Sequence, residues 1–346
     1  MRLFTSNSDK KEEQDTLLKS SLLMLFSFVL ICTSTEIFWR ALSHTPSVTD
    51  DAKLWSLERK KIDKKNPRII ALIGASRIMT DLSTDSLRSN FPDYQICNLA
   101  ITGLGCISAL HNLAEDENFK GIVFCDVTED IILKSDDSIA LKPYFDCYKK
   151  SFGFNALINR EISTFIQSNF VIFDPHINLI LVAGYLADRH RLRPPRYIHT
   201  IPDRSIITDY SITDTLKIKE ERIKARYEDF RKIGKPITTD NFLMSLVSME
   251  KDISKIKRRG GEVVLIKFPV SGELKKIDDS HFPKELYWDK MINVISANTI
   301  HYINYKNLNG FNCPDYSHLD KKDVPIFSNR LICIMKKLDF FRKNGH

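Results

Sequence analysis

The alternation of short apolar runs with helix-like segments, which begins at Arg68, constrains the fold of this chain more than any other feature. The first run, "RIIALIG" (68–74), is β-rich and apolar, as a parallel strand buried on both faces would be. A helix is predicted over 83–90, and the runs "YQICNLA" (94–100) and "GIVFCDV" (121–127) predict two further strands. This alternation predicts an α/β fold with three layers, in which a mostly parallel sheet carries helices on both faces.

The same alternation returns in the C-terminal part of the chain. An amphipathic helix over 240–259 ends at two glycines, and "EVVLIKFPV" (262–270) predicts the next strand. A helix over 283–296 and a strand over 299–305 follow. The last helix is expected from about Asp323 to Lys337, directly after "DYSHLD".

Residues from about Lys134 to Lys235 interrupt this pattern. They contain helix-like stretches, the basic segment "RHRLRPPRYIH" (189–199) and a charged helix over 214–232, but no clear alternation of strand and helix. We therefore predict one α/β domain over 67–338 with a helical insertion at about 134–235. The basic segment is either a contact for an acidic polymer or a solvated loop.

The N-terminus contains an apolar run of another kind. Residues 20–35, "SSLLMLFSFVLICTST", carry no charge, and the apolar character continues to Trp39. This length approaches the roughly 20 residues that a membrane-spanning helix needs. The run predicts a transmembrane signal anchor over 20–40, with a cytoplasmic tail over 1–19 and a linker over 41–66. A buried core helix is the alternative.

The orientation of this anchor does not follow from its flanking charges, since basic residues are nearly equal in number on the two sides. The segment after the apolar run offers only a poor signal-peptidase site, which favours an uncleaved anchor. A short tail followed by a large body favours a single-pass protein of the cytoplasmic (inner) membrane. Its folded domain is then expected on the periplasmic or extracytoplasmic side.

Composition excludes some classes of function. The net charge of +7 arises from 51 basic and 44 acidic residues, so no concentrated basic excess suggests a nucleic-acid partner. The seven cysteines form no CxxC pair and no cluster at metal-ligand spacing, and we expect neither a metal site nor a cofactor. Cys97, Cys125 and Cys333 lie in apolar runs, which predicts small buried side chains rather than disulfides.

Ser76 stands in "IGASR", at the predicted carboxyl end of the first strand. Ligands of open α/β sheets bind at this edge, so a reacting group is expected there. Gly74 would permit the tight backbone path that presents the serine hydroxyl. The alternative is that Ser76 only caps the following helix.

Two glycines and a short acidic motif point to the same edge. Gly103 and Gly105 follow the second strand, where backbone N–H groups could form an oxyanion hole. In "NCPDYSHLD", Asp315 stands three residues before His318 and just ahead of the last helix. Taken alone, that pair could be a turn residue and a surface imidazole.

In this order, the serine block, the glycine block and the closing D-x-x-H resemble the SGNH hydrolases, also called the GDSL-like esterase superfamily. The serine block "GASR" and the end "DYSHL" are similar to a membrane-anchored group with G-x-S-R and D-x-x-H-L patterns, and "KFPVSG" (267–272) also looks like that group. The resemblance covers about 68–337, except the insertion. It implies an SGNH or flavodoxin-like sheet, with Ser76 as nucleophile, His318 as general base and Asp315 as the group that orients the imidazole.

The chain departs from the superfamily pattern at one position. The third block usually carries an asparagine that donates to the oxyanion, whereas the third strand here leads into "CDVTED". Thr128 is a candidate replacement in an oxyanion hole that also includes the N–H groups of Ser76 and of Gly103 or Gly105. Arg77 is a candidate substrate-binding residue, or else it packs on the sheet or pairs with an acid.

The resemblance leads to two hypotheses on function. The first is a membrane-anchored serine esterase or O-acyltransferase that acts on an O-acyl group, expected to be acetyl, of a cell-surface glycan. Its expected partners are an acylated glycan or other small ester, the lipid bilayer and envelope biosynthesis proteins. The second is a catalytically degraded protein of the same fold that binds or helps assemble an envelope polysaccharide. A nucleotide-binding protein is remote, because no GxGxxG or Walker-type loop occurs.

Six further histidines show no ligand spacing in the sequence. We expect each to be a surface or locally hydrogen-bonded side chain rather than a metal ligand. They are His111, His176, His190, His199, His281 and His301.

Overall fold

The structure, a computed structural model, describes residues 7–62, 68–134, 138–177, 179–189, 192–233 and 236–338. The chain divides into two compact units. The N-terminal unit comprises residues 1–47 and 166–196, and the sheet unit comprises residues 48–165 and 197–346.

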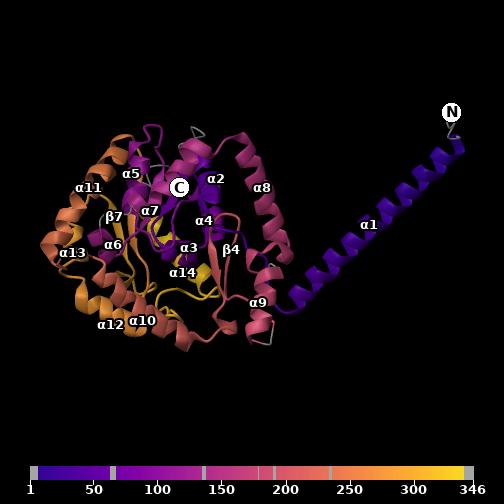
Figure 1. The fold of residues 1–346 in the computed structure, drawn as a ribbon. Helices are drawn as coiled ribbons and strands as arrows, with labels where there is room; N and C mark the ends of the chain where they lie inside the picture. The colour runs from indigo at the N-terminus through magenta and orange to yellow at the C-terminus, as the bar shows by residue number, and fades with distance from the viewer. Residues whose placement is uncertain are drawn as a thin grey trace. The chain divides into compact units, whose positions relative to one another are not determined.

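Parallel strands form the centre of the sheet unit, with helices around them (Figure 1). There are five, in the spatial order β2-β1-β3-β6-β7. They are β1 (Ile69–Ile73), β2 (Gln95–Asn98), β3 (Ile122–Asp126), β6 (Glu262–Lys267) and β7 (Asn298–His301). This is the order of flavodoxin-like sheets, in which the chain adds β2 on one side of β1 and then adds β3, β6 and β7 on the other. The predicted α/β fold with a parallel sheet is therefore confirmed.

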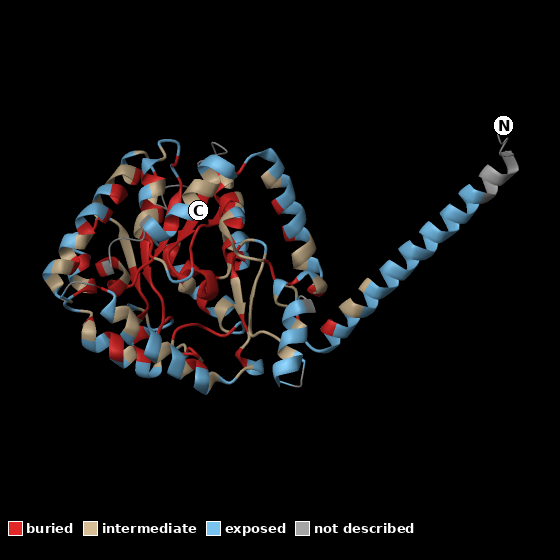
Figure 2. Ribbon diagram, viewed as in Figure 1, coloured by how far each residue is buried: buried red, intermediate tan, exposed pale blue. Residues whose placement is uncertain are grey.

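Apolar side chains cover both faces of this sheet. Alternate residues of β1 contribute to two separate cores: Ile69, Ala71 and Ile73 face one core, while Ile70 and Leu72 face the other. Most residues of these strands are buried, red in Figure 2, and only the first residues of β2, β6 and β7 are partly exposed.

Helices close each core. The first core receives α2 (Ala52–Ile62), α5 (Ile107–Glu115), α11 (Thr239–Arg258) and α13 (Trp288–Met291). The second receives α3 (Ser76–Asp81), α4 (Thr84–Asn90), α12 (Gly272–His281) and α14 (Val324–Met335). Helices therefore pack on both faces, as the sequence predicts.

Some elements differ from the sequence prediction. Helix α2 occupies the second half of the expected linker over 41–66, because Trp55 is fully buried and its Nε1 donates to the Leu99 carbonyl at 3.0 Å. Residues 63–67 of that linker lie outside the described residues. Of the helix expected over 283–296, only α13 is helical. Helix α12 was not predicted.

The insertion is mainly helical in its described part, as expected. It contains the end of α6 (Glu129–Lys134), α7 (Ser138–Asp146), α8 (Phe154–Asn169), α9 (Leu179–Arg189), α10 (Thr215–Arg231) and short π and 3₁₀ segments. An antiparallel hairpin of β4 (Ile198–Thr200) and β5 (Ile206–Thr208) was not predicted. The basic segment 189–199 thus enters β4, and its residues 190 and 191 lie outside the described residues.

The N-terminal unit contains helix α1 (Asn7–Ala41), which includes the apolar run. Among the described residues, its part Glu13–Ala41 alone is long and apolar enough to cross a membrane, with a mean hydropathy of 1.9. Near the end of α1, Trp39 is buried with Val171 and Ile177, which lie far away in the sequence.

The seven cysteines are free. Cys97 and Cys125 are buried, as predicted, but the expectation of a buried Cys333 is wrong. Its neighbours on α14, Leu331, Ile332 and Met335, face the core, and Cys333 is left on the exposed side of the helix.

Candidate active site

The turn between β1 and α3 requires a glycine. Gly74 has a φ of 131°, and a Cβ atom there would lie 2.5 Å from the Cβ of Asp126 at the end of β3. Asp126 also accepts a hydrogen bond from the Ala75 N–H at 3.3 Å. Burial raises the pKa of Asp126 to about 6. The glycine of "GASR" therefore lets the chain pass close to the neighbouring strand and presents the next residues at the sheet edge.

Ser76 is the first residue of α3 and does not cap it. The capping position is Ala75, which makes no side-chain cap hydrogen bond. The Oγ atom of Ser76 instead lies 2.8 Å from Nε2 of His318, which is 242 positions later in the chain. The structure thus brings the predicted nucleophile to the predicted base.

Asp315 holds both the His318 ring and the loop that carries it. Its Oδ2 lies 2.9 Å from Nδ1 of His318. Its Oδ1 accepts the backbone N–H groups of Ser317 at 2.8 Å and His318 at 2.7 Å. With Nδ1 donating to the carboxylate, Nε2 of a neutral imidazole is free to accept the Ser76 proton. The D-x-x-H spacing thus places the imidazole and the carboxylate that orients it in one tight loop.

The segment after β6 supports that loop. Tyr316 has a φ of 72°, which is unusual for a residue with a side chain, and its carbonyl accepts the Ser271 N–H at 3.0 Å. Gly272, also at positive φ, lies directly against the Tyr316 ring, and a Cβ atom there would collide with it. The end of the "KFPVSG" segment therefore packs against the D-x-x-H loop and hydrogen-bonds to it.

Burial and charge set the protonation of the pair. Burial alone would raise the pKa of Asp315. The hydrogen bond from His318, the positive charge of a protonated His318 and the charge of Arg222 instead hold that pKa well below its usual range. Burial lowers the pKa of His318, against the opposing effect of Asp315, and the positive charges of Arg222 and Arg77 lower it further. The imidazole is therefore neutral, and able to act as a base, at a lower pH than a free histidine.

Arg222 is a site residue that the sequence did not reveal. It comes from α10 of the insertion, and its Nε donates to Oδ2 of Asp315 at 3.0 Å. Its Nη2 lies 3.3 Å from Nδ1 of His318. Nδ1 carries a hydrogen that it donates to Asp315, so it cannot also accept a hydrogen bond from Arg222. The guanidinium of Arg222 therefore acts on the imidazole through its charge alone. Arg222 was only one of many basic residues of a charged helix, so its role depends on the tertiary fold.

One turn later on α10, Arg226 fixes the position of Arg222. Its guanidinium is buried and pairs with Asp130 at 2.9 Å and with Asp278 at 2.6 Å. Residues four positions apart lie on the same face of a helix, so this double ion pair holds the Arg222 face of α10 toward the site. Removing one partner of such a buried pair would be strongly destabilising.

A pocket of about 180 Å³ opens beside Ser76 and His318. Gly103, at a φ of 78°, lies in its wall, whereas Gly105 is buried and is not part of the lining. Thr128 also lines the pocket, and its Oγ1 is buried with no hydrogen-bond partner among the described residues. The pocket thus joins Ser76 with two of the three other predicted oxyanion-hole residues.

Arg77 lines the same pocket and contacts the D-x-x-H loop. Its Nε lies 3.4 Å from the Ser317 carbonyl and its Nη2 lies 3.3 Å from the Ser317 hydroxyl. These contacts are long for hydrogen bonds, so the guanidinium is weakly held and can also serve a ligand. The charged residues of the pocket lining are three arginines, Arg77, Arg222 and Arg226, and two aspartates, Asp130 and Asp229.

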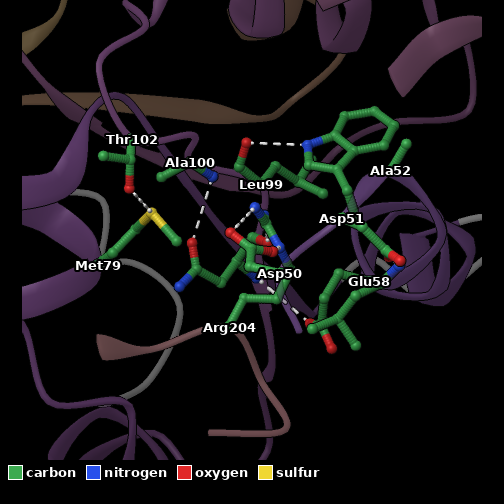
Figure 3. A network of polar contacts seen from close by, with 12 residues as sticks. Asp50, Asp51, Ala52, Glu58, Met79, Leu99, Ala100, Thr102 and Arg204 are labelled. Atoms are coloured by element: carbon green, nitrogen blue, oxygen red, sulfur yellow. Dashed lines mark hydrogen bonds and ion pairs between the residues drawn. The ribbon is translucent and has the colours of Figure 1, made fainter. Parts of the chain in front are cut away.

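A polar network holds the end of β2, from which the chain continues to Gly103 (Figure 3). Arg204, from the hairpin of the insertion, is fully buried and pairs with both carboxylate oxygens of Asp50 at 2.6 and 3.0 Å. It also donates to the Asn98 carbonyl at 2.8 Å, and Oδ1 of Asn98 accepts the Ala100 N–H at 3.2 Å. Through Arg204, the insertion is therefore bonded to the end of β2, just before the turn that contains Gly103.

Away from the pocket, one cluster has metal-type side chains. His111 lies 3.0 Å from Asp252 and 4.0 Å from Glu115. The ammonium of Lys255 pairs with both carboxylates and already supplies the positive charge that a cation would bring. An ion-pair network on the surface explains this cluster without a metal.

Two other histidines of the sheet unit make local contacts of their own. His301 is buried against the ring of Trp288, and its Nδ1 accepts the Ile303 N–H at 3.2 Å. Nδ1 of His281 lies 2.9 Å from the Ile277 carbonyl. His190 lies outside the described residues.

Removal of the Arg222 charge should move the pH dependence of the site. If His318 acts as the base of an ester hydrolysis, the acid limb of kcat/KM follows the pKa of this residue, which burial lowers from its ordinary value. In Arg222→Gln, loss of the neighbouring positive charge raises that pKa, and we expect the acid limb to shift to higher pH. Arg222→Lys keeps the charge and should keep the limb. An unshifted limb in Arg222→Gln would show that Arg222 acts on the fold alone.

Compared with known proteins, the chain matches no family model, no curated protein and no solved structure.

Proposed function

We propose that this protein is a membrane-anchored serine esterase or O-acyltransferase of the SGNH type. One observation carries the proposal: the hydrogen-bonded series from Ser76 Oγ through His318 to Asp315, with distances of 2.8 and 2.9 Å. A serine hydroxyl is a weak nucleophile until an adjacent base takes its proton, and such a base needs a fixed ring. A structural role alone does not require three such partners at the edge of a pocket.

The proposed reaction proceeds in two steps. Ser76 Oγ attacks the carbonyl carbon of an ester while His318 Nε2 takes its proton, and the tetrahedral intermediate collapses as His318 returns the proton to the leaving alcohol. The acyl group is then bound to Ser76. Water resolves it in an esterase, and a sugar hydroxyl resolves it in a transferase, with His318 again acting as the base.

Stabilisation of the oxyanion is proposed to rest on main-chain donors. The N–H groups of Ser76 and Gly103 belong to residues that line the pocket, and Gly103 lets the chain approach a ligand closely. Thr128 would contribute if its hydroxyl turned toward the pocket. This set supports activity without the usual asparagine of the third block.

The proposed substrate is an O-acyl group, in particular acetyl, on a cell-surface glycan. A pocket of about 180 Å³ suits a short acyl chain with part of its alcohol. Arg77 in its wall, which is held by long contacts to Ser317, favours a substrate that carries a negative group near the ester. No cofactor enters this reaction, and envelope biosynthesis proteins are the proposed partners.

The anchor is proposed to be α1, as an uncleaved single span in the cytoplasmic membrane. The end of α1 packs on residues 169–182 of the N-terminal unit, so cleavage near that end would remove part of a packed core. This supports retention of the helix. The proposal puts the sheet unit on the periplasmic or extracytoplasmic side.

A second candidate is a protein of this fold that binds an envelope glycan without catalysis. The bond of Arg222 to Oδ2 of Asp315 favours it, because the guanidinium shares the oxygen that must orient His318. The missing asparagine favours it also. The distinction depends on whether Ser76 is activated.

Labelling by a fluorophosphonate probe tests the proposal in the full-length protein. Only an activated serine reacts with such a probe, so we expect a single labelled residue, Ser76. Labelling should vanish in Ser76→Ala and persist in Ser248→Ala, which alters an exposed serine on α11. An unlabelled Ser76 in a folded protein would favour the binding function.

A further inference from the structure

The end of α1 is bound to a segment that lies about 130 residues later in the chain. The two carboxylate oxygens of Glu36 accept the N–H groups of Val171 and Ile172, each at 3.0 Å. Arg40 pairs with Glu36 at 2.6 Å and donates to the Asn169 carbonyl at 2.7 Å. The segment from 169 to 172 therefore lies at the level of Glu36, the first charged residue after the apolar run.

This level has a physical meaning if α1 spans a membrane. A carboxylate cannot remain in the hydrocarbon without large cost, so Glu36 marks the boundary between the hydrocarbon and the headgroups. Its bonds to two N–H groups and to Arg40 satisfy the charge at that boundary. Residues tied to Glu36 are then at the same depth.

Two aromatic side chains in and just after this segment are exposed. Phe170 is 43% exposed and Phe173, three residues later, is 51% exposed. Two aromatic rings beside a water-filled exterior would add an unfavourable apolar surface. Beside headgroups they would lie in the region where amphipathic and aromatic side chains are favoured.

Helix α9, which follows at once, extends this apolar surface. Its sequence, "LILVAGYLADR", is apolar or small until Asp188 and Arg189. Val182 and Tyr185 are half-buried, yet Ile180 is 85% exposed and Leu186 is 45% exposed, and Figure 2 shows most of α9 in pale blue. A surface helix in water normally presents a polar face on its exposed side, and α9 presents apolar residues there.

Basic residues accompany this surface. Arg189 is exposed in the last turn of α9, and Arg40 is about half exposed at the end of α1. Their guanidinium groups can reach anionic headgroups while the apolar side chains lie deeper. The combination fits a lipid surface better than an apolar protein surface, which would offer no partner to the exposed Arg189.

We infer that residues 170–177 and 179–189 form a membrane-surface foot, which lies in the headgroup region of the same bilayer that α1 crosses. The foot is defined by Phe170, Phe173, Ile180 and Leu186 on its apolar side. This inference rests on the proposed anchoring by α1 and goes beyond it, since the foot would hold the protein at a fixed depth by contacts on a second segment.

The test uses the full-length protein in nanodiscs of phosphatidylethanolamine and phosphatidylglycerol that contain lipids with a photoreactive diazirine on the acyl chain. Crosslinked residues are mapped by mass spectrometry. We expect lipid adducts on the apolar run of α1 and on the foot. Met244 and Val247, exposed apolar residues of α11, are the internal controls and should show background labelling.

Each outcome has a distinct meaning. Adducts on α1 with background labelling on the foot would overturn the inference and leave the anchor intact. Background labelling on both would overturn the proposed anchoring as well. Crosslinks from the foot to a second copy of the chain, in place of lipid, would identify a protein interface and also overturn the inference.

Two matched double variants test whether lipid contacts of the foot depend on its exposed apolar side chains. Ile180→Glu with Leu186→Glu places two charges on the foot, and both positions are exposed, so the fold should survive. We expect lipid labelling at Phe170 and Phe173 to fall while labelling of α1 persists. Met244→Glu with Val247→Glu should leave both unchanged, and equal labelling of Phe173 in the two double variants would contradict the foot.

Discussion

Replacing His318 by alanine should lower kcat/KM for p-nitrophenyl acetate by about 10⁴- to 10⁶-fold. Nε2 of His318 is the acceptor nearest to the Ser76 hydroxyl, at 2.8 Å, so its loss leaves the serine without a base. Arg77 and Arg222, which line the pocket beside it, cannot take its place because they are permanently charged donors, and the lining carboxylate of Asp130 is paired with Arg226. The measurement is initial-rate hydrolysis by the purified full-length protein across a range of ester concentrations.

Controls must separate chemistry from folding, since His318 is buried. His318→Gln keeps much of the side-chain volume and should lose activity to a similar degree. His111→Ala removes a histidine whose side chain is 60% exposed, and should change the rate little. If His318→Gln folds and retains activity within tenfold of the wild type, another base must serve Ser76.

Asp315→Asn should lower kcat/KM by about 10⁴-fold, with less effect on KM than on kcat. The asparagine amide can turn its NH₂ toward Nδ1 and favour the tautomer that carries the proton on Nε2, which cannot accept from Ser76. Arg222 would also face a neutral amide in place of its carboxylate partner. Hydrolysis of the same ester, with circular dichroism to monitor folding, measures this effect.

Asp320→Asn is the matched control for Asp315→Asn. Asp320 lies in the same loop and accepts backbone N–H groups of Tyr210 and Lys322, but no contact links it to His318. We expect a change of only a few-fold. A loss in Asp320→Asn as large as that in Asp315→Asn would show that loop stability, and not orientation of the imidazole, accounts for the effect.

Much of the fold follows from local sequence patterns. The strand β1 and most of β3 and β6 are continuous apolar runs, and such runs are stable only when neighbouring strands and helices cover them on both faces. Helices α4, α10, α11 and α14 begin and end within a few residues of the predicted bounds. The elements missed are those whose stability comes from contacts: α2 depends on burial of Trp55, and the β4–β5 hairpin carries the buried Arg204.

The sequence by itself determined which residues could carry the proposed chemistry. Gly74 and Ser76 in "GASR", and Asp315 and His318 in "DYSH", are short-range patterns, because a turn or a loop of a few residues sets their geometry. The approach of Ser76 to His318, across 242 positions, required the parallel sheet to bring two distant strand ends to one edge.

Only the tertiary structure decided which residues of the insertion reach that edge. Arg222 is one basic residue among many on α10, and only the double ion pair of Arg226 with Asp130 and Asp278 turns it toward Asp315. Likewise, nothing local links Glu36 of α1 with Val171. Such contacts depend on the packing of segments far apart in the chain, because no pattern in either segment alone specifies its partner.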